Sequence, residues 1–383
     1  MRKGLAPVLS GGTNMLKRFA VTGFKNFRDE CVVDFSRVRD YDFNKNLIKN
    51  NLINKALLYG KNGSGKSNLG LAIMDITLHL TDNMRDVIKY LFALNGDTPS
   101  NRITFEYCFD FDGKEVVYTY EKNGEMFLLN EKIFVDGKNV FEYDYTKNTM
   151  ASSLKELTAL NKDALARRNI NNSVIKTIYG FSAHLPDDSP IKRIFEFANG
   201  MLWFRSLGNY EFMGSIPYTD SVERFIVEDR KRIDRFRDFL AECGMAYRFT
   251  VIDSGIGGKQ LYACFENQNY PFFQIASTGT RSLALFFYWM EKMKGHITFL
   301  FLDEFDAFYH FNLAQGILKQ VNSDDSYQSI VTTHNPYLAD NSIMRPDCYL
   351  NLKDGKVKSF SDSTTRKIRE GNSLEKMVLS DDL

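Results

Sequence analysis

Hydrophobic positions in the first part of the chain change from the strand period to the helix period at a run of glycines. Residues 16–24 alternate in part between apolar and polar side chains, and residues 53–59 form a short apolar run that ends at Gly60. The apolar residues of the next segment recur at spacings of four, three and four, as on one face of a helix: Leu69, Ile73, Ile76 and Leu80. The pattern predicts strands up to residue 60 and a helix shortly after it.

Residues 101–145 have the pattern of a β-meander. Strand-like runs such as 116–120 and 126–129 lie between three dipeptides that can supply the positive φ angles of tight hairpins. These dipeptides are Asp112-Gly113, Asn123-Gly124 and Asp136-Gly137. We expect consecutive antiparallel strands in this segment.

Residues 150–245 carry helical patterns and few strand signals. Between residues 219 and 240 the apolar side chains gather on one side of a helix, and the other side mixes arginine with acidic residues. The apolar side is formed by Val222, Phe225, Ile226, Ile233, Phe236 and Phe239. We expect a helical insertion with a solvated, charged face.

The remainder of the chain predicts a parallel sheet unit. Strand signals at 247–276 precede a very apolar helix at 283–290, and a strand, a helix and a strand follow. These three elements are expected at 297–302, 313–321 and 329–333, and a final hairpin is expected at Asp354-Gly355.

The expected fold class is therefore α/β, with a mixed sheet, an antiparallel β-meander and a helical insertion. The expected segments are a flexible extension at 1–14, the first part of the main lobe at 15–148, the insertion at 149–246, the second part of the lobe at 247–362 and a tail at 363–383.

Composition narrows the function classes. The 383 residues are 44% hydrophobic, and 49 basic residues balance 48 acidic ones, so no overall charge attracts nucleic acid or an anionic membrane, although a local basic face stays open. Five cysteines without CxxC spacing indicate reduced core thiols in a cytoplasmic protein, and five scattered histidines argue against a zinc site. No apolar run is long enough to span a bilayer.

The strongest chemical signal is GKNGSGKS, residues 60–67, which matches GxxxxGK[ST] between a predicted strand and a predicted helix. In such a P-loop, or Walker A motif, backbone N–H groups wrap around phosphates and the helix N-terminus adds positive potential. Lys66 is expected to reach the β- and γ-phosphates, and Ser67 to ligate Mg²⁺. The residues expected to bind the nucleotide are Gly60, Asn62, Gly63, Ser64, Gly65, Lys66, Ser67 and Asn68.

A second signal is ITFLFLDE, residues 297–304, an apolar strand that ends in two acids. Asp303 fits the Walker B role of holding Mg²⁺ through water, and Glu304 fits a general base that polarises the attacking water. Many buried strands end in acids, so the signal gains its strength from the P-loop upstream. His334 follows a β-rich run, where a histidine that contacts the γ-phosphate would lie; a capping or packing histidine is the alternative.

A third signal is ASTGTRSLA, residues 276–284. Ser277, Gly279 and Thr280 stand at the start of a predicted buried helix, where a hydroxyl and a glycine can form a second phosphate cradle. By itself the segment is more typical of an ordinary N-cap, in which Ser277 or Thr280 satisfies free N–H groups.

The order of these motifs resembles the ABC-type ATPase head, including the SMC, RecF and overcoming-lysogenization-defect groups. The resemblance covers nearly the whole chain from Leu16 and implies ATP and Mg²⁺ as cofactors, with STGT as the signature motif in place of LSGGQ. It implies that two heads pair head to tail, so that Ser277 and Gly279 of one head cover the ATP held by Lys66 of the other.

The same resemblance extends to two smaller motifs. Asp306 matches the position of the D-loop. The segment GFKNFRD, residues 23–29, is similar to the first strand of these families, which implies that Asn26, Phe27 and Arg28 lie near the nucleotide. One departure is clear: no glutamine lies between Ser67 and Lys259, where these heads carry their Q-loop glutamine.

The closing segment and the compact size are similar to those of bacterial ATPases encoded next to a nuclease or toxin in anti-phage and abortive-infection systems. The lack of sustained heptads excludes long SMC arms. No metal-ligand cluster or nuclease motif follows Glu304. The resemblance implies a cytoplasmic ATPase that assembles with itself and controls an effector protein encoded nearby, without a membrane.

Two other functions stay open. A RecF- or SMC-like DNA-repair ATPase would need a basic groove; Arg167-Arg168 and the arginines of 224–237 supply basic residues, but acids interleave with the second set, so nucleic acid is not indicated. The missing glutamine leaves open a scaffold that binds ATP with little turnover. The choice of ATP over GTP follows from the resemblance alone.

Overall fold

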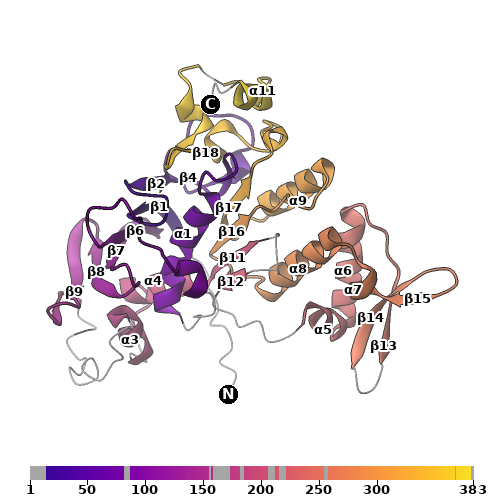
Figure 1. Ribbon diagram of the computed structural model, residues 1–383, viewed down its shortest axis with the longest axis horizontal. Helices are drawn as coiled ribbons and strands as arrows, with labels where there is room; N and C mark the ends of the chain where they lie inside the picture. Colours follow the sequence, from indigo (N-terminus) through magenta and orange to yellow (C-terminus); the bar gives the residue numbers. More distant parts are fainter. Residues whose placement is uncertain are drawn as a thin grey trace.

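The computed structural model describes residues 14–81, 87–154, 157, 173–181, 185–205, 212–214, 221–253, 258–366 and 368–380. Two seven-stranded sheets form the left and central parts of the molecule in Figure 1, and a three-stranded sheet with its helices forms the lobe at the right. Within the described residues no helix is long and apolar enough to cross a membrane. The extension expected at 1–14 lies outside the described residues, except for Asn14, which begins β1.

The central layer is a mixed sheet in the order β12-β11-β16-β17-β5-β18-β19. Its five inner strands are parallel, while β12 and β19 pair antiparallel at the edges. Inner parallel strands are covered on both faces, which explains the unbroken apolar run of β16. The bounds are β5 Lys55–Tyr59, β11 Met201–Arg205, β12 Phe212–Gly214, β16 Phe299–Asp303, β17 Gln328–Thr333, β18 Tyr349–Lys353 and β19 Lys356–Ser359. Helix α9 (Phe311–Ser323) joins β16 to β17, as the sequence predicts.

The second seven-stranded sheet is the predicted meander, in the antiparallel order β10-β9-β8-β7-β6-β1-β2. The turns after β6 and β8 use the predicted Asp-Gly pairs with positive φ at both residues. At the third turn Met126, not Gly124, has the positive φ, because the loop is longer and the Asn123 side chain accepts from the backbone N–H of Glu125 and Phe127. The bounds are β1 Asn14–Thr22, β2 Cys31–Asp34, β6 Ile103–Phe111, β7 Lys114–Lys122, β8 Leu128–Val135, β9 Lys138–Asp144 and β10 Thr149–Ser152.

Helix α1 (Lys66–Leu80) lies between these two sheets and is buried on nearly every side. On the central sheet, Gly70 approaches β16 so closely that a Cβ there would come within 2.5 Å of the Phe301 ring. On the meander side, the hydroxyl of Tyr107 donates to the backbone carbonyls of Ala72 and Ile73 at 3.0 and 3.1 Å. The helix that follows the P-loop is therefore held by both sheets.

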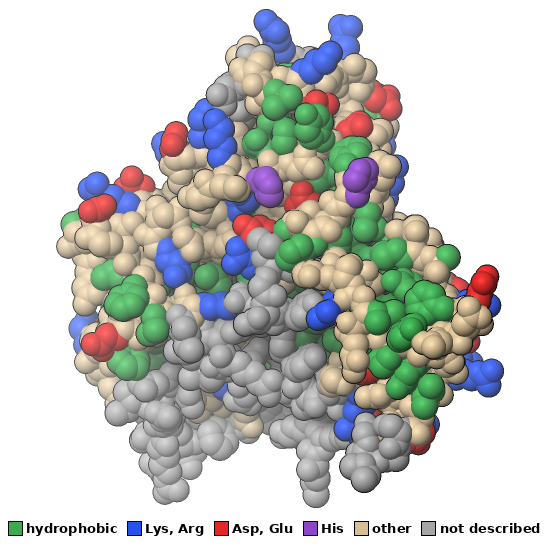
Figure 2. Space-filling model, turned by 45° about the vertical axis from the view of Figure 1, so that its right-hand side comes forward, with side chains coloured by type: hydrophobic (Ala, Val, Ile, Leu, Met, Phe, Trp, Pro, Cys, Tyr) green, Lys and Arg blue, Asp and Glu red, His purple; other side chains and the backbone are tan. Residues whose placement is uncertain are grey.

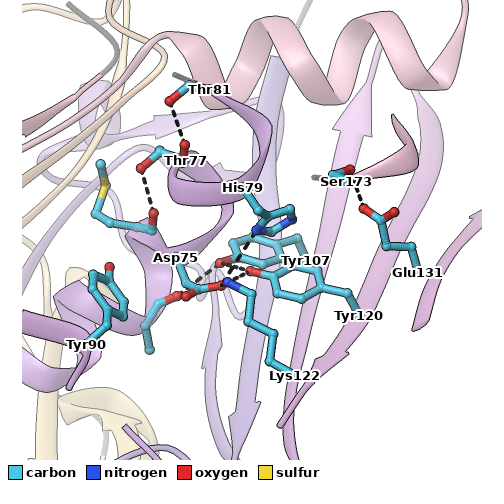
Figure 3. A network of polar contacts seen from close by, with 12 residues as sticks. Asp75, Thr77, His79, Thr81, Tyr90, Tyr107, Tyr120, Lys122, Glu131 and Ser173 are labelled. Atoms are coloured by element: carbon cyan, nitrogen blue, oxygen red, sulfur yellow. Dashed lines mark hydrogen bonds and ion pairs between the residues drawn. The ribbon is translucent and has the colours of Figure 1, made fainter. Parts of the chain in front are cut away.

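A buried polar network joins the second half of α1 to the meander (Figure 3). The ammonium of Lys122 donates to Oδ2 of Asp75 at 2.6 Å, and the hydroxyl of Tyr120 donates to the same oxygen at 2.8 Å. His79 pairs with the hydroxyl of Tyr118 at 2.9 Å, and burial lowers the pKa of its imidazole. Because the charged groups are paired, α1 can carry them in the interior.

The network continues from Tyr118 to a helix that follows the meander in the chain. The Tyr118 hydroxyl donates to Glu131 at 2.6 Å, and Ser173 donates to the same carboxylate at 2.5 Å. The backbone N–H of Val174, the first residue of α3 (Val174–Phe181), donates to the other oxygen of Glu131 at 3.0 Å. Helices α3 and α4 (Pro190–Asn199) are therefore anchored beside α1.

The segment 149–246 is not purely helical. It contains β11 and β12, which belong to the central sheet, so the expectation of a helical insertion with few strands needs correction. The helix expected at 219–240 is divided into α5 (Val222–Val227) and α6 (Arg230–Glu242). The division lies at Asp229, whose carboxylate accepts from the backbone N–H of Lys231 and caps α6. Arg167 and Arg168 lie outside the described residues.

The lobe at the right of Figure 1 combines α5 and α6 with a small antiparallel sheet and two further helices. The aromatic rings of Phe236, Phe249, Phe272 and Phe287 pack together in its core. The remaining elements are β13 Phe249–Asp253, β14 Lys259–Cys264, β15 Asn269–Pro271, α7 Phe272–Ile275 and α8 Thr278–Lys292. Helix α8 is the predicted apolar helix.

The end of the chain returns to the central sheet. The predicted hairpin at Asp354-Gly355 joins β18 to β19, and α10 (Phe360–Ser363) follows. The side-chain amide of Asn341 donates to the carbonyls of Arg369, Glu370 and Asn372, which fastens the tail before α11 (Leu374–Leu379). Helix α11 thereby lies against the short turn Pro336–Leu338 that follows His334.

Candidate nucleotide-binding site

The glycine-rich loop 60–67 runs from the end of β5 into α1, as the sequence predicts. Gly63 and Gly65 have φ angles of +80° and +105°, a backbone region that side chains disfavour. A Cβ on Gly65 would overlap the side-chain amide of Asn26. Glycine is therefore required at Gly65 both by the backbone and by the neighbouring side chain.

Asn26 connects the early GFKNFRD segment to this loop. Its amide nitrogen lies 3.4 Å from the backbone carbonyl of Ser64, and its amide oxygen accepts from Asn68 at 2.7 Å. Phe27 is buried in the core, whereas the side chain of Arg28 is exposed. Of the three residues expected near the nucleotide, Asn26 lies directly on the P-loop.

Lys66 lies in a buried position and folds back over its own loop. Its ammonium donates to the carbonyl of Gly60 at 2.6 Å and to that of Lys61 at 3.2 Å. Burial lowers the pKa of Lys66, while the carboxylates of Glu304 and Asp303 oppose this shift. The ammonium and these two carboxylates therefore share one electrostatic environment.

The carboxylate of Asp303, at the end of β16, is fully buried. Its Oδ1 accepts from the hydroxyl of Thr332 at 2.9 Å, and the hydroxyl of Ser67 lies close enough to the carboxylate to lower its pKa. Burial raises the pKa of Asp303, and the interactions with Ser67 and Thr332 oppose this. Its Oδ2 is buried without a hydrogen-bond partner in the described part of the chain.

A hydroxyl beside a buried carboxylate with an unsatisfied oxygen suits a magnesium ion. Mg²⁺ binds proteins through one or two carboxylates and keeps water and phosphate oxygens as its other ligands. The described residues contain no group of three or more His, Cys, Asp or Glu side chains that could hold a metal by themselves. The residues present therefore fit an ion that arrives with a nucleotide.

Glu304 has an unusual backbone conformation, with a φ angle of +46°. Its backbone N–H donates to the hydroxyl of Thr332 at 2.8 Å, so Thr332 bridges both acids. Residues in this region of φ are uncommon and cluster at functional sites, where the surrounding structure holds them.

Arg205 holds the side chain of Glu304. Its Nη2 and Nε donate to the same oxygen, Oε2, at 2.6 and 3.1 Å. Its Nε also lies 3.7 Å from Oδ2 of Asp303. Arg205 was not predicted as a site residue because the surrounding segment was expected to be helical. The apolar run MLWF before the arginine could have indicated a buried strand that ends at this position.

Asp306 and His334 complete this end of the sheet. Oδ2 of Asp306 accepts from the hydroxyl of Thr333 at 2.7 Å, and burial raises the pKa of Asp306. His334 and Lys66 both lie near enough to oppose that shift. The side chain of His334 is exposed at the end of β17. The structure thus brings together Lys66, Ser67, Asp303, Glu304, Asp306 and His334.

The signature segment lies on the other lobe, at the start of α8. Ser277 is the N-cap: its Oγ accepts from the backbone N–H of Thr280 at 3.2 Å and lies 2.9 Å from the Thr280 hydroxyl. A Cβ on Gly279 would come within 3.0 Å of the carbonyl of Phe308. Among the described residues no hydrogen bond joins Ser277 or Thr280 to the P-loop. Within one chain the two predicted phosphate-binding segments are separate.

Part of the chain matches a known family. Residues 266–340 match the family described as "AAA domain, putative AbiEii toxin, Type IV TA system". The matched segment contains α8, both acids of β16 and His334. A search of curated proteins gives no significant match.

Solved structures of SMC heads are similar to the chain over most of its length. An SMC head bound to the C-terminal winged-helix domain of ScpA has 16% identity and a TM-score of 0.42, and covers 90% of this chain and 96% of its own. The SMC head from Thermotoga maritima has 14% identity and a TM-score of 0.44, with 92% and 99% covered. An SMC head with an extended coiled coil, bound to the C-terminal domain of ScpA and derived from Pyrococcus furiosus, has 17% identity and a TM-score of 0.44, with 96% and 99% covered.

The topology described above confirms the predicted α/β P-loop head with a mixed sheet and an antiparallel meander, whereas the predicted helical insertion contributes β11 and β12 to the central sheet. The segment that matches the AAA domain family, residues 266–340, lies within this P-loop fold.

Proposed function

We propose that this chain is an ABC-type ATPase that hydrolyses Mg²⁺-ATP at the interface between two heads paired head to tail. One observation carries the proposal: Lys66, Asp303 and Glu304 share one environment at the P-loop, with Ser67 beside Asp303. A lysine, a hydroxyl and two carboxylates in this arrangement match what phosphoryl transfer to water requires.

The backbone N–H groups of residues 60–67 and the start of α1 bind the β- and γ-phosphates. Lys66 exchanges the carbonyls of Gly60 and Lys61 for phosphate oxygens. Ser67 and Asp303 hold Mg²⁺, which neutralises phosphate charge when it is bound.

Hydrolysis then depends on the acid and the histidine at the ends of β16 and β17. Glu304 orients the attacking water and accepts its proton, as a general base within hydrogen-bond reach can do. His334 is exposed at the neighbouring strand end and contacts the γ-phosphate.

The second head supplies Ser277 and Gly279. Ser277 is exposed at the start of α8, and its side-chain hydrogen bonds in the described part of the chain go to Thr280 rather than to the P-loop of its own chain. Three large hydrophobic side chains next to the signature, the D-loop and His334 are also exposed: Ile275, Phe308 and Tyr337. Figure 2 shows hydrophobic side chains gathered on the lobe that carries α8. Acidic and histidine side chains lie near the middle of the same face. Burial of such side chains favours pairing of the heads.

Three of the five arginines of α5 and α6 contact carboxylates, which supports a protein partner over DNA. Arg224 pairs with Glu228, Arg235 with Glu291, and Arg237 with both Asp234 and Asp238. A DNA groove needs arginines that neutralise phosphates, whereas these guanidinium groups already contact carboxylates.

The partner that we propose is an effector nuclease or toxin in anti-phage defence, controlled by the ATP state of the heads. The match of residues 266–340 to a family described as a putative AbiEii toxin of a type IV toxin–antitoxin system supports this. The assignment to a cytoplasmic defence system is an inference from that name and from the motif resemblance.

Light scattering with and without Mg²⁺-ATP tests the proposal, for the wild type and for Glu304→Gln. We expect the wild type to hydrolyse ATP and Glu304→Gln to lose turnover by about 100-fold or more while it accumulates an ATP-bound dimer. A monomer under every condition would exclude the paired heads. Equal behaviour of the two proteins would instead indicate an ATP-binding scaffold without turnover.

A further inference from the structure

We propose that Arg205 replaces the missing glutamine as the γ-phosphate sensor, and that ATP transfers its guanidinium from Glu304 to the γ-phosphate. This inference rests on the proposed function and names the residue that links nucleotide state to the catalytic base.

The strand order places Arg205 at the site. Strand β11 lies parallel to β16, and the register pairs Arg205 with Asp303. The carboxyl ends of neighbouring parallel strands meet at one edge of a sheet, which is where ligands bind in α/β folds. Arg205, the last residue of β11, therefore lies beside the acids at the end of β16. Arg205 and Glu304 are 99 positions apart in the sequence.

The charges around the site explain why Arg205 contacts Glu304. The carboxyl groups of Asp303, Glu304 and Asp306 all act on the ammonium of Lys66. Arg205 donates twice to Glu304 and approaches the unsatisfied Oδ2 of Asp303 at 3.7 Å. The guanidinium thus offsets carboxylate charge that a Mg²⁺ ion held by Ser67 and Asp303 would also offset.

Nucleotide changes that balance. A bound Mg²⁺ would compensate the charge of Asp303. The γ-phosphate would then offer the guanidinium of Arg205 an acceptor with more charge than a carboxylate, with two oxygens that arginine can bind in a bidentate manner. ADP lacks this acceptor. Departure of the guanidinium frees Oε2 of Glu304 to accept the proton of water. Both side chains have room to move, since Arg205 is 31% and Glu304 20% exposed.

The backbone on either side of this contact is held in place. Strand β11 pairs with β16 on one side and with β12 on the other. The backbone of Glu304 is tied to Thr332. A change of partner therefore needs only side-chain rotation of Arg205, which is fast relative to enzyme turnover.

Equilibrium binding of ATP and ADP, in the presence of Mg²⁺, tests the sensor directly. The measurements use the full chain in a Glu304→Gln background, where hydrolysis does not interfere, and compare Arg205→Ala and Arg205→Lys. We expect Arg205→Ala to weaken ATP binding by about tenfold or more, the size of a lost charge-assisted hydrogen bond, and ADP binding by about twofold at most. Arg205→Lys should retain part of the preference for ATP, because lysine keeps the positive charge but lacks the planar guanidinium group that binds two oxygens.

Arg235 provides a matched control. Arg235 lies on α6, and its Nη2 and Nε donate to one oxygen of Glu291 at 2.6 and 2.9 Å. This geometry is nearly that of the pair formed by Arg205 and Glu304. Arg235→Ala should leave the affinities for ATP and ADP unchanged. Equal losses of ATP and ADP affinity in Arg205→Ala, or no loss at all, would overturn the sensor role while the proposed ATPase stands. Absence of nucleotide binding by the wild type would overturn both.

Discussion

The hydroxyl of Ser67, in the first turn of α1, lies beside the carboxylate of Asp303 at the end of β16. The two residues are far apart in the sequence, and the buried Oδ2 of Asp303 has no hydrogen-bond partner in the described part of the chain. We expect Ser67→Ala to lower Mg²⁺-dependent ATP hydrolysis by about 100-fold, because the ion loses a ligand that positions the phosphates. Steady-state turnover against Mg²⁺ concentration measures this.

Ser67→Thr is the control, since threonine carries the same hydroxyl and the P-loop pattern accepts it. Turnover of Ser67→Thr should stay within about threefold of the wild type. Equal activity of Ser67→Ala and the wild type at limiting Mg²⁺ would contradict the magnesium assignment.

The stability of the folded chain should depend on pH through Asp303. Burial raises the pKa of Asp303, so the folded state binds its proton more tightly than the unfolded state. The ionised carboxylate therefore costs stability above its raised pKa, and this cost fades as pH falls toward the ordinary value of about 4. Asp303→Asn should melt about 1–3 °C above the wild type at neutral pH, with a difference that shrinks on acidification.

Asp144 is a control of opposite sign. Hydrogen bonds from Thr146 and the backbone lower the pKa of Asp144 to about 2. Its ionised form stabilises the fold above pH 4, and this contribution is lost as pH falls toward 2. Asp144→Asn should therefore melt below the wild type at neutral pH. If thermal melts across this pH range show the same sign for both variants, the assignment of the Asp303 effect to burial is wrong.

The buried pair of Asp75 and Lys122 should dominate the stability of the α1–meander junction. Asp75 is fully buried and the side chain of Lys122 is 3% exposed, so Lys122→Met leaves a charge in the interior without its main partner. We expect a loss of about 3–5 kcal/mol in the free energy of unfolding, measured by urea denaturation. Arg102→Met breaks an ion pair with Glu121 in which Arg102 is 55% exposed, and should cost at most about 1 kcal/mol. Similar losses for the two variants would argue against a buried charge at Asp75.

Mixing two inactive variants distinguishes a site shared between chains from a site within one chain. Lys66→Ala disables the P-loop side of a site, and Ser277→Arg disables the signature side. If heads pair head to tail, a mixed dimer has one site with both sides intact, and an equimolar mixture should recover on the order of a quarter of wild-type turnover.

The matched control mixes Lys66→Ala with Glu304→Gln. Both changes lie on the P-loop side, so each chain of a mixed dimer carries a damaged site, and turnover should stay near the level of the separate variants. Recovery in this control, or none in the first mixture, would speak against a shared site.

Several features followed from local patterns in the sequence. The glycines of the P-loop were predictable because positive φ angles at Gly63 and Gly65 favour glycine in any fold. The meander turns at Asp112 and Asp136 follow from the same backbone preference. The apolar run of β16 and its terminal acids were predictable because a buried parallel strand needs continuous hydrophobic residues.

Contacts between distant segments were decided by the tertiary structure. Nothing near residue 205 in the sequence indicates Glu304 as a partner; the pairing of β11 with β16 brings them together. Asp229 divided a predicted long helix because its side chain caps α6 at that point. The charges of Asp75 and Lys122 look like surface charges in the sequence and are buried only because two sheets enclose α1. Hydrophobic periodicity and turn preferences act over a few residues, so the sequence by itself determined the elements and the P-loop. The partners of charged side chains depend on which strands become neighbours, and only the packing of the sheets decided that.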